Sequence, residues 1–300
     1  MANRVVVSVN PNAGSRSARE RVLHLRRLLE AQGLETEIVE ALDNAEFLAK
    51  KWHSQGRLRC LVSVGGDGTA AELVNRTASG LPMTLLPAGN ENLLARYLGL
   101  GDSPETVCRT ITDGKLIHLD AGAANGRIFL LMISCGFDAD VVRRVHDSRT
   151  GHVSWRSYFK PILKSIRSYH YPRLRVYWDD QSGDAADRSR PSLEACWTFA
   201  FNLPCYGMGL RLAPRADGRD GLLDVCAFRR GSLWHGLRYA GAVWLGRHEG
   251  LADCTTRRVR RLRIESEAGV PYQLDGDPGG LLPVDVEVVP NRLTLVVPSS

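Results

Sequence analysis

Short apolar runs alternate with amphipathic segments along residues 1–119. The runs are rich in β-branched residues and end in turn residues, which predicts strands covered on both faces. These strands are Val5–Val9, Thr36–Val39, Cys60–Val64 and Thr84–Leu86. Apolar residues that recur every three or four positions predict helices after them, at Arg16–Gln32, Ala45–Gln55, Ala70–Ser79 and Glu91–Leu98. This alternation predicts an α/β domain with a parallel sheet.

After Leu119 the pattern changes to strands that follow one another with few helices. Several alternate polar and apolar residues, as Val284–Val288 does, which is typical of antiparallel strands with one solvent-facing side. The predicted strands are Ile128–Cys135, Arg173–Trp178, Cys196–Asn202, Leu222–Phe228, Arg258–Ile264, Tyr272–Leu274, Val284–Val289 and Leu293–Val297. We therefore predict an α/β domain over residues 1–119 and an all-β, sandwich-like domain over 120–289. Residues 290–300 are expected to pack back on the first domain.

Composition narrows the class of protein. A chain of 300 residues with 44% hydrophobic residues can bury two cores without disulfide or metal staples. Its seven cysteines show no C-x-x-C spacing and mostly lie in apolar runs, which predicts free buried thiols and a reducing compartment. No apolar stretch reaches the ~18 residues that cross a bilayer, and the first residues lack a signal peptide. We expect a cytoplasmic location, with any membrane contact peripheral.

A glycine-rich turn, Gly65-Gly66-Asp67-Gly68-Thr69, follows the third predicted strand. Glycines let backbone N–H groups approach a phosphate chain closely, and a following helix adds its positive end. Asp67 stands where a carboxylate can bind Mg²⁺ or orient a hydroxyl group. An ordinary strand-to-helix turn needs only one glycine, so the whole pattern favours a phosphate site.

Two further turns follow strands of the same predicted sheet. Asn10–Gly14 follows the first strand, and Pro87–Asn92 follows the fourth. Ligands of open parallel sheets bind at the carboxyl ends of the strands. The three turns are therefore expected to line one crevice.

Together these turns resemble the diacylglycerol kinase catalytic family of lipid kinases, which includes bacterial lipid kinases, sphingosine kinases and ceramide kinases. The family patterns are N-P-x-x-G, G-G-D-G-T-x-x-E-x-x-N and P-x-G-T-x-N-x-x-A-R. The matching residues are Asn10, Pro11 and Gly14, then Gly65–Thr69, Glu72 and Asn75, then Pro87, Gly89, Asn92, Ala95 and Arg96. Later matches are Gly136–Asp138, Asn202, Tyr206–Gly209, Pro214, Asp220–Val225 and Asp275–Asp277. The combination is specific, whereas NAD kinases and phosphofructokinases carry loops similar to G-G-D-G-T alone.

The resemblance implies an ATP- and Mg²⁺-dependent kinase that transfers the γ-phosphate to a lipid hydroxyl, with diacylglycerol or a relative as acceptor. It implies a nucleotide site formed by Asn10, Pro11, Asn12, Ala13, Gly14, Arg16, Gly65, Gly66, Asp67, Gly68, Thr69, Glu72, Gly89, Asn90 and Asn92. Asp67 would lie at the transferring phosphoryl group, and Asp277 would be the general base. Asp220, with carbonyl groups near Asp217 and Leu222, would bind Mg²⁺.

Two residues depart from the family patterns. Asn90 stands in place of threonine, and Asp277 in place of a glutamate that is one methylene longer. A general base must come within roughly 2.6–3.2 Å of its proton, so the shorter side chain keeps a catalytically impaired pseudokinase as an alternative. An NAD-kinase-like enzyme is a further alternative, against which the Pro87–Arg96 and Asp220–Val225 blocks argue. The sequence leaves open which lipid is the acceptor and whether the protein is a homodimer.

The net charge is +6, and much of the basic excess lies between residues 143 and 175. Aromatic residues are interleaved there, and Pro161 predicts the first turn of a helix whose apolar face carries Ile162, Leu163, Ile166 and Tyr169. Such a helix either docks on an anionic membrane or packs on its own domain with a solvated cationic face. The basic run 257–263 alternates like one strand and would extend this surface. No recognised nucleic-acid-binding motif is present, so nucleic acid is not the expected partner.

Overall fold

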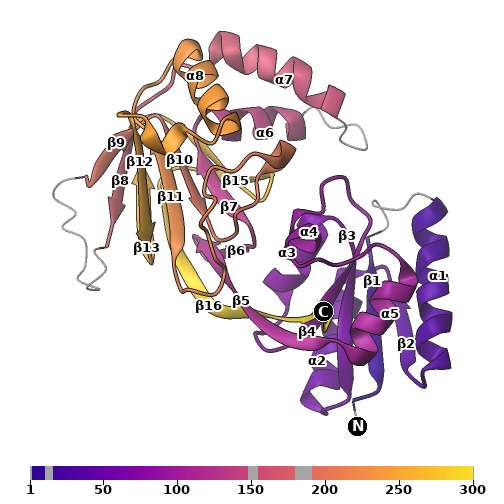
Figure 1. The fold of residues 1–300 in the computed structure, drawn as a ribbon. Helices are drawn as coiled ribbons and strands as arrows, with labels where there is room; N and C mark the ends of the chain where they lie inside the picture. Colours follow the sequence, from indigo (N-terminus) through magenta and orange to yellow (C-terminus); the bar gives the residue numbers. More distant parts are fainter. Residues whose placement is uncertain (1, 11–15, 148–154, 180–190, 300) are drawn as a thin grey trace. The chain divides into compact units, whose positions relative to one another are not determined.

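The computed structural model describes residues 2–10, 16–147, 155–179 and 191–299. The chain divides into two compact units, which are coloured along the sequence in Figure 1. Unit 1 comprises Met1–Ala121 and Pro290–Ser300, and unit 2 comprises Gly122–Val289. Unit 1 is therefore made of two separate stretches of the chain.

Unit 1 contains the predicted parallel sheet. Its strands are β1 (Arg4–Val9), β2 (Glu35–Val39), β3 (Leu58–Gly65), β4 (Pro82–Pro87) and the second half of β16 (Val284–Val297). They lie in the order β2-β1-β3-β4-β16, and all four neighbouring pairs are parallel. The prediction of a parallel α/β sheet is confirmed.

Helices cover the unit 1 sheet on both faces (Figure 1). They are α1 (Arg16–Ala31), α2 (Leu42–Ser54), α3 (Asp67–Arg76), α4 (Leu93–Tyr97) and α5 (Pro104–Asp113). Leu25 of α1 and Ile111 of α5 share one hydrophobic cluster with Val62 of β3. The sequence reasoning missed α5. Ser103 was the available signal for its start, because the Ser103 side chain caps the helix by accepting a hydrogen bond from the Thr106 N–H at 3.2 Å.

Residues 284–297 form one long strand, β16, where two strands were predicted. Pro290, which has no N–H group to donate, lies between the two predicted strands. In the structure, Asn291 adopts a left-handed φ of 51°, and its N–H donates to the buried Asp120 carboxylate at 2.7 Å. This side-chain acceptor satisfies the backbone at the irregular position, so the strand continues from unit 2 into unit 1.

Unit 2 is the predicted antiparallel β sandwich. Its strands, with β5 entering from unit 1, are β5 (Lys115–Ala124), β6 (Arg127–Phe129), β7 (Met132–Cys135), β8 (Leu174–Trp178), β9 (Leu193–Ala195), β10 (Trp197–Phe201), β11 (Leu223–Phe228), β12 (Cys254–Val259), β13 (Arg261–Glu265), β14 (Pro271–Leu274) and β15 (Asp277–Leu281). One sheet has the order β12-β11-β10-β7-β14-β15, and the other runs β16-β13-β8-β9. Ile133 and Val225 from the first sheet share one buried cluster with Val176 and Val284 from the second. The predicted sandwich is confirmed.

Two segments predicted as single strands are each two strands. Residues 128–135 divide into β6 and β7 because the Asp275 carboxylate accepts hydrogen bonds from the N–H groups of Leu130 and Leu131 between them. Residues 258–264 divide at Arg260, which leaves β12 and β13 in different sheets. The basic run 257–263 therefore does not form one continuous strand.

The described part of unit 2 contains three helices. They are α6 (Phe137–Asp147), α7 (Trp155–Ser168) and α8 (Leu233–Trp244), with short 3₁₀ turns at Gly207–Gly209 and His248–Gly250. The helix predicted to start at Pro161 instead starts at Trp155, so that Pro161 lies inside it. In the described part of the chain, no helix combines the length and apolar character needed to span a bilayer.

The contact of α7 with α6 uses only part of the predicted apolar face: Tyr169, directly after α7, packs edge-on against Phe137 of α6, with ring centroids 5.8 Å apart. Pro161 and Ser165 are buried, and the Ser165 hydroxyl donates to Asp140 of α6 at 2.8 Å. Ile162 and Leu163 remain 39% and 37% exposed. The face of α7 that packs within unit 2 is therefore the one that carries Ser165.

All seven cysteines are free thiols. Five of them are buried, and Cys205 and Cys254 are partly exposed. The prediction of free thiols is confirmed, and burial is confirmed at five of the seven positions.

Candidate functional site

The glycine-rich turn after β3 is shorter than predicted, because α3 begins at Asp67 and not at Ala70. The Gly66 carbonyl accepts hydrogen bonds from the N–H groups of Thr69 at 3.1 Å and Ala70 at 3.2 Å, which closes the first helical turn. The N–H groups of Asp67 and Gly68 precede these donors and have no acceptor within the helix, although that of Asp67 interacts with its own carboxylate. They lie at the positive end of a helix of 10 residues, where an anion is stabilised.

Asp67 connects this turn to the outlet of β4, by which we mean the loop that follows the strand at its carboxyl end. Its two carboxylate oxygens accept hydrogen bonds from the N–H groups of Leu93 and Leu94, both at 2.9 Å. Burial raises the pKa of Asp67, and these two N–H donors offset part of that rise because they stabilise the charged form. The carboxylate therefore holds the start of α4 next to the start of α3.

The β3 and β4 outlets also touch through their backbones. A Cβ atom added to Gly89 would lie 2.5 Å from the Gly66 Cα and 2.9 Å from the Asn92 Oδ1. Asn92 accepts a hydrogen bond from the Gly89 N–H at 3.0 Å and donates one to the Gly89 carbonyl at 2.9 Å. Gly89 is thus required by this close approach, and the side chain of Asn92 closes the loop around it.

The β1 outlet reaches the same place through Asn10. Its amide donates to the Thr69 hydroxyl at 3.0 Å, and its N–H donates to the Val64 carbonyl at 3.2 Å. The structure thus brings together the described residues of all three predicted outlets. Four further residues assigned to the nucleotide site, Pro11, Asn12, Ala13 and Gly14, lie outside the described residues, as does the side chain of Arg16.

Two other residues assigned to the nucleotide site lie beside these outlets. Glu72 points to its own helix surface, where it forms an ion pair with Arg76 at 2.9 Å. Asn90 is exposed in the loop between β4 and α4. The donors at this end of the sheet, which are helix N–H groups and the Asn10 amide, have the chemistry that binds a phosphate chain.

In unit 2, the assigned base Asp277 opens β15 after a tight turn. Asp275 and Gly276 in that turn have φ angles of 52° and 90°. The Asp277 carboxylate is partly exposed and makes no hydrogen bond or ion pair with any described residue. Asp275 is structural, since its carboxylate holds three backbone N–H groups, those of Leu130, Leu131 and Met132.

A buried polar cluster lies behind this turn. Gln273 accepts a hydrogen bond from the Gly276 N–H at 2.7 Å and donates to the Ser134 hydroxyl at 2.8 Å. Ser134 in turn donates to the Asp138 carboxylate, which also receives a hydrogen bond from Tyr206 at 3.4 Å. Burial raises the pKa of Asp138, and the Ser134 hydrogen bond offsets part of that rise. Sequence reasoning found Asp138 only by resemblance and missed Gln273, whose polar side chain in the apolar strand β14 was the available signal.

The residues assigned to Mg²⁺ are satisfied by protein groups. The Asp220 carboxylate forms an ion pair with Arg258 and accepts a hydrogen bond from the Leu222 N–H at 2.9 Å. The Asp217 carbonyl accepts hydrogen bonds from the N–H groups of Arg219 at 2.7 Å and Asp220 at 3.3 Å. A guanidinium group takes up the charge that a divalent cation would neutralise, so this arrangement does not fit a Mg²⁺ ion.

Glycine-lined strand outlets on a parallel sheet, combined with a β sandwich, define a protein of the NAD kinase and diacylglycerol kinase fold class. Residues 4–124 match the diacylglycerol kinase catalytic domain, and residues 131–297 match the YegS C-terminal NAD kinase beta sandwich-like domain. The chain belongs to the diacylglycerol kinase family of lipid kinases. This family implies a phosphotransferase that acts on an alcohol group.

Relatives with known names agree with this assignment. The chain is 29% identical over 241 residues to a diacylglycerol kinase of Mycobacterium tuberculosis, which covers 78% of this chain and 75% of that protein. It is 21% identical over 301 residues to a diacylglycerol kinase of Bacillus subtilis, which covers 98% of this chain and 96% of that protein.

Two solved structures share the fold. A crystal structure of a diacylglycerol kinase from Bacillus anthracis superposes with a TM-score of 0.67 at 18% identity, covering 99% of this chain and 97% of that one. An NAD kinase from Archaeoglobus fulgidus, solved in complex with ATP, superposes with a TM-score of 0.55 at 13% identity, covering 99% of this chain and 94% of that one.

Proposed function

We propose that the protein transfers the γ-phosphate of ATP to the hydroxyl group of a membrane lipid, with diacylglycerol or a related lipid as the acceptor. The observation that carries this proposal is the meeting of Asn10, Gly66 and Gly89 at the carboxyl ends of three parallel strands. Family membership and the names of the relatives support the lipid acceptor.

Phosphate binding in this proposal is a property of unit 1. The first-turn N–H groups of α3 and the Asn10 amide bind the phosphate chain of ATP, and Mg²⁺ accompanies the nucleotide and neutralises its charge. Asp67 holds the two loops in register by its hydrogen bonds to Leu93 and Leu94. Its remaining lone pairs could accept a hydrogen bond from the acceptor hydroxyl, or the carboxylate could hold a Mg²⁺ ion that neutralises charge at the transferring group.

The reaction itself needs an acceptor for one proton. The lipid hydroxyl oxygen attacks the γ-phosphorus, the bond between the γ-phosphorus and the bridging oxygen breaks, and ADP leaves. The hydroxyl proton passes to Asp277, whose carboxylate has no competing partner among the described residues. The hydrogen bond from Gly276 to Gln273 holds the turn that presents this carboxylate.

The test is phosphorylation of a total lipid extract by radiolabelled ATP, with the product identified by its mass. Asp67→Asn removes one of the two acceptors that hold α4 and removes the charge, so product formation should fall below about 1% of wild type. Asp43→Asn is the matched control, because this exposed carboxylate makes a surface ion pair with Arg76. Turnover that is equal in the Asp67 and Asp43 variants would contradict the proposal.

The pseudokinase interpretation predicts a different outcome. A protein that binds ATP without phosphorylating any lipid of the extract would favour it. The double variant Asn90→Thr/Asp277→Glu restores the family residues at both positions, so under that interpretation it should gain turnover.

A further inference from the structure

The outward face of α8 carries the largest group of exposed apolar side chains on any element in the described part of the chain. These are Trp234, Leu237, Trp244 and Leu245, which are 79%, 56%, 75% and 66% exposed. The other exposed large apolar side chains are spread over five elements, with at most two on any one of them. Two largely solvent-exposed tryptophans on one helix are unusual for a surface that contacts only water.

The spacing of these residues places them on one side of the helix. Positions 234, 237, 241, 244 and 245 recur every three or four residues. The opposite side is already packed, because Tyr239 and Val243 are buried and the Tyr239 ring stacks on Phe228 at 4.3 Å. The exposed apolar face is therefore not needed to hold α8 on unit 2.

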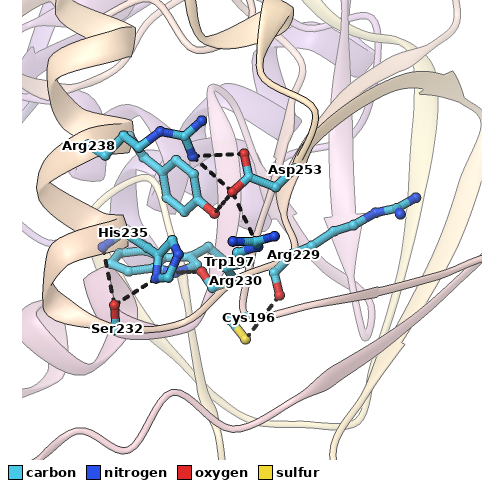
Figure 2. Close-up of polar contacts among 9 residues, drawn as sticks. Cys196, Trp197, Arg229, Arg230, Ser232, His235, Arg238 and Asp253 are labelled. Carbon is cyan, nitrogen blue, oxygen red and sulfur yellow. Dashed lines mark hydrogen bonds and ion pairs between the residues drawn. The ribbon is translucent and has the colours of Figure 1, made fainter.

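The contacts of α8 hold it firmly in this orientation, as Figure 2 shows. Asp253 accepts hydrogen bonds from the Tyr239 hydroxyl at 2.8 Å and from Arg238 at 3.0 Å. The Ser232 side chain caps the start of the helix by accepting from the His235 N–H at 3.2 Å. The indole of Trp197 donates to the Arg230 carbonyl at 3.2 Å just before the helix. The outer face is thus presented without a rearrangement of the helix.

The charges around this face are mostly positive. Residues 229–253 contain four arginines, whereas the two acids among them, Glu249 and Asp253, are paired with Arg215 and with Arg230 and Arg238. Arg238 lies on α8 and Arg247 is exposed three residues after its end, whereas Arg229 precedes the helix by four residues and its side chain extends away from it (Figure 2). Arg230 and Arg238 share the charge of Asp253, which leaves Arg229 and Arg247 without an ion pair in the described residues.

We propose that this face, formed by Trp234, Leu237, Trp244 and Leu245 with Arg247 just beyond the helix end, docks on an anionic lipid bilayer. Tryptophan and leucine enter the boundary between headgroups and acyl chains, while the arginine at the edge pairs with a lipid phosphate. Docking needs no phosphoryl transfer, so the inference goes beyond the proposed function and can be tested without ATP.

A second copy of the chain fits this face less well. In a two-fold dimer the same surface meets itself, so the excess of arginine around α8 would face arginine, and α8, whose one arginine is Arg238, carries no acid to pair with it. An anionic bilayer supplies the opposite charge. The surface is also distinct from the segment 143–175, although Ile162 and Leu163 of α7 are half exposed in the same unit.

The test is co-sedimentation of the whole protein with vesicles of phosphatidylcholine, with and without phosphatidylglycerol, in the absence of nucleotide. Trp234→Ser/Trp244→Ser should weaken binding to the phosphatidylglycerol vesicles by about tenfold or more. Phe47→Ser is the matched control, since this aromatic side chain is 62% exposed on α2 of unit 1 and should have no effect. Both double-variant side chains are exposed, so the melting temperature should stay unchanged.

The arginines are tested in the same assay. Arg247→Gln should lower binding several-fold and flatten its dependence on salt, whereas Arg229→Gln, whose side chain extends away from α8, should change neither. Equal vesicle binding by wild type and the double tryptophan variant would overturn the proposal. A wild type that binds no vesicles and that the double tryptophan variant converts from dimer to monomer would assign this face to a second copy.

This experiment and the phosphorylation assay fail independently. A protein that binds vesicles through α8 but phosphorylates no lipid would refute only the proposed function. A protein that phosphorylates dispersed lipid but binds vesicles without α8 would refute only the docking surface.

Discussion

Single side chains near the strand outlets have structural as well as chemical tasks. Asp67 accepts two backbone hydrogen bonds and therefore fixes the β4–α4 loop, while burial raises its pKa. A raised pKa means that acidification protonates this carboxylate earlier than an ordinary aspartate. If its charged form is needed for phosphoryl transfer, activity falls on the acid side for that reason.

Asp224 on β11 gives a residue-scale prediction about stability. Burial and the nearby negative charge of Glu249 raise its pKa from 3.8 to about 6, and Arg215 offsets part of the rise. A carboxyl whose pKa is raised on folding contributes stability at pH values below its unfolded pKa, and this contribution is lost as pH rises through 6. Asp224→Asn removes the buried charge, so the melting temperature should rise by about 2–4 °C at pH 8 and change little at pH 4.

Thermal melts at the two pH values check this prediction. Asp43→Asn, at an exposed position, should change the melting temperature at neither pH. If Asp224→Asn is less stable than wild type at pH 8, the prediction is wrong. The negative charge of Asp224 would then stabilise the fold by pairing with Arg258, whose Nε lies 3.8 Å from the carboxylate.

The ion pair of Asp220 with Arg258 predicts how the protein without nucleotide responds to metal. Because the guanidinium neutralises the carboxylate, replacing Mg²⁺ by a chelator should shift the wild-type melting temperature by less than ~1 °C. Arg258→Gln leaves the carboxylate unpaired, so this variant should be less stable and should gain stability from Mg²⁺. Equal stabilisation of both proteins by Mg²⁺ would show that Arg258 gives way to the ion and that Asp220 is a metal ligand.

At the scale of elements, the arrangement of the candidate site depends on two loops that touch. Gly66 immediately precedes α3, and Gly89 lies in the loop before α4; their backbones approach too closely for a side chain at position 89. The obstacle is backbone and not the end of a flexible side chain, so it cannot simply move aside.

Gly89→Ala is therefore expected to lower both the melting temperature and the affinity for ATP, the latter about tenfold or more, because it separates the two loops. Calorimetric titration with ATP and a thermal melt measure the two effects. Gly250→Ala is the control, since nothing lies within 4 Å of an added Cβ there. An alanine at 89 that leaves ATP affinity intact would mean that the loops do not act as one phosphate site.

Strand and helix patterns predicted most elements of unit 1, because each apolar run there is buried by helices on both faces. The start of α3 was misplaced by three residues because glycines hide the helical pattern, and the Gly66 carbonyl decides the boundary. The convergence of Asn10, Gly66 and Gly89 followed from the rule for parallel sheets. The hydrogen bonds of Asp67 could not be predicted, since they join residues 26 and 27 positions apart.

Unit 2 was harder to predict from local pattern. The divisions at residues 130–131 and at Arg260, and the continuity of β16 through Pro290, depend on distant partners such as Asp275 and Asp120. Helix α8 was missed because apolar residues occur on both of its sides and Gly236 and Gly241 interrupt it. Because apolar residues occur on both sides of α8, the sequence pattern also did not distinguish the exposed apolar face from the packed one.

At the scale of the whole molecule, unit 1 depends on the far end of the chain. Residues 290–300 belong to it, β16 pairs with β4, and Leu295 is buried. Arg292 adds hydrogen bonds to the carbonyl groups of Val74 and Thr77 at the end of α3.

A chain that ends at residue 289 should therefore lose cooperative folding of unit 1, whereas a chain that ends at Val297 should melt as the full protein does. Thermal melts together with ATP binding compare the two. If the shorter chain keeps the same melting temperature and ATP affinity, the second half of β16 is not part of the core of unit 1.

The central claim is that the glycine-lined outlets of β1, β3 and β4 bind the phosphates of ATP, and hydrogen–deuterium exchange tests it most directly. Saturating Mg²⁺ and ATP should slow exchange in peptides that cover residues 65–70 and 88–94, and leave the edge strand β12 unchanged. If ATP binds and protects other parts of the chain but leaves both of these peptides as fast as before, the account is contradicted.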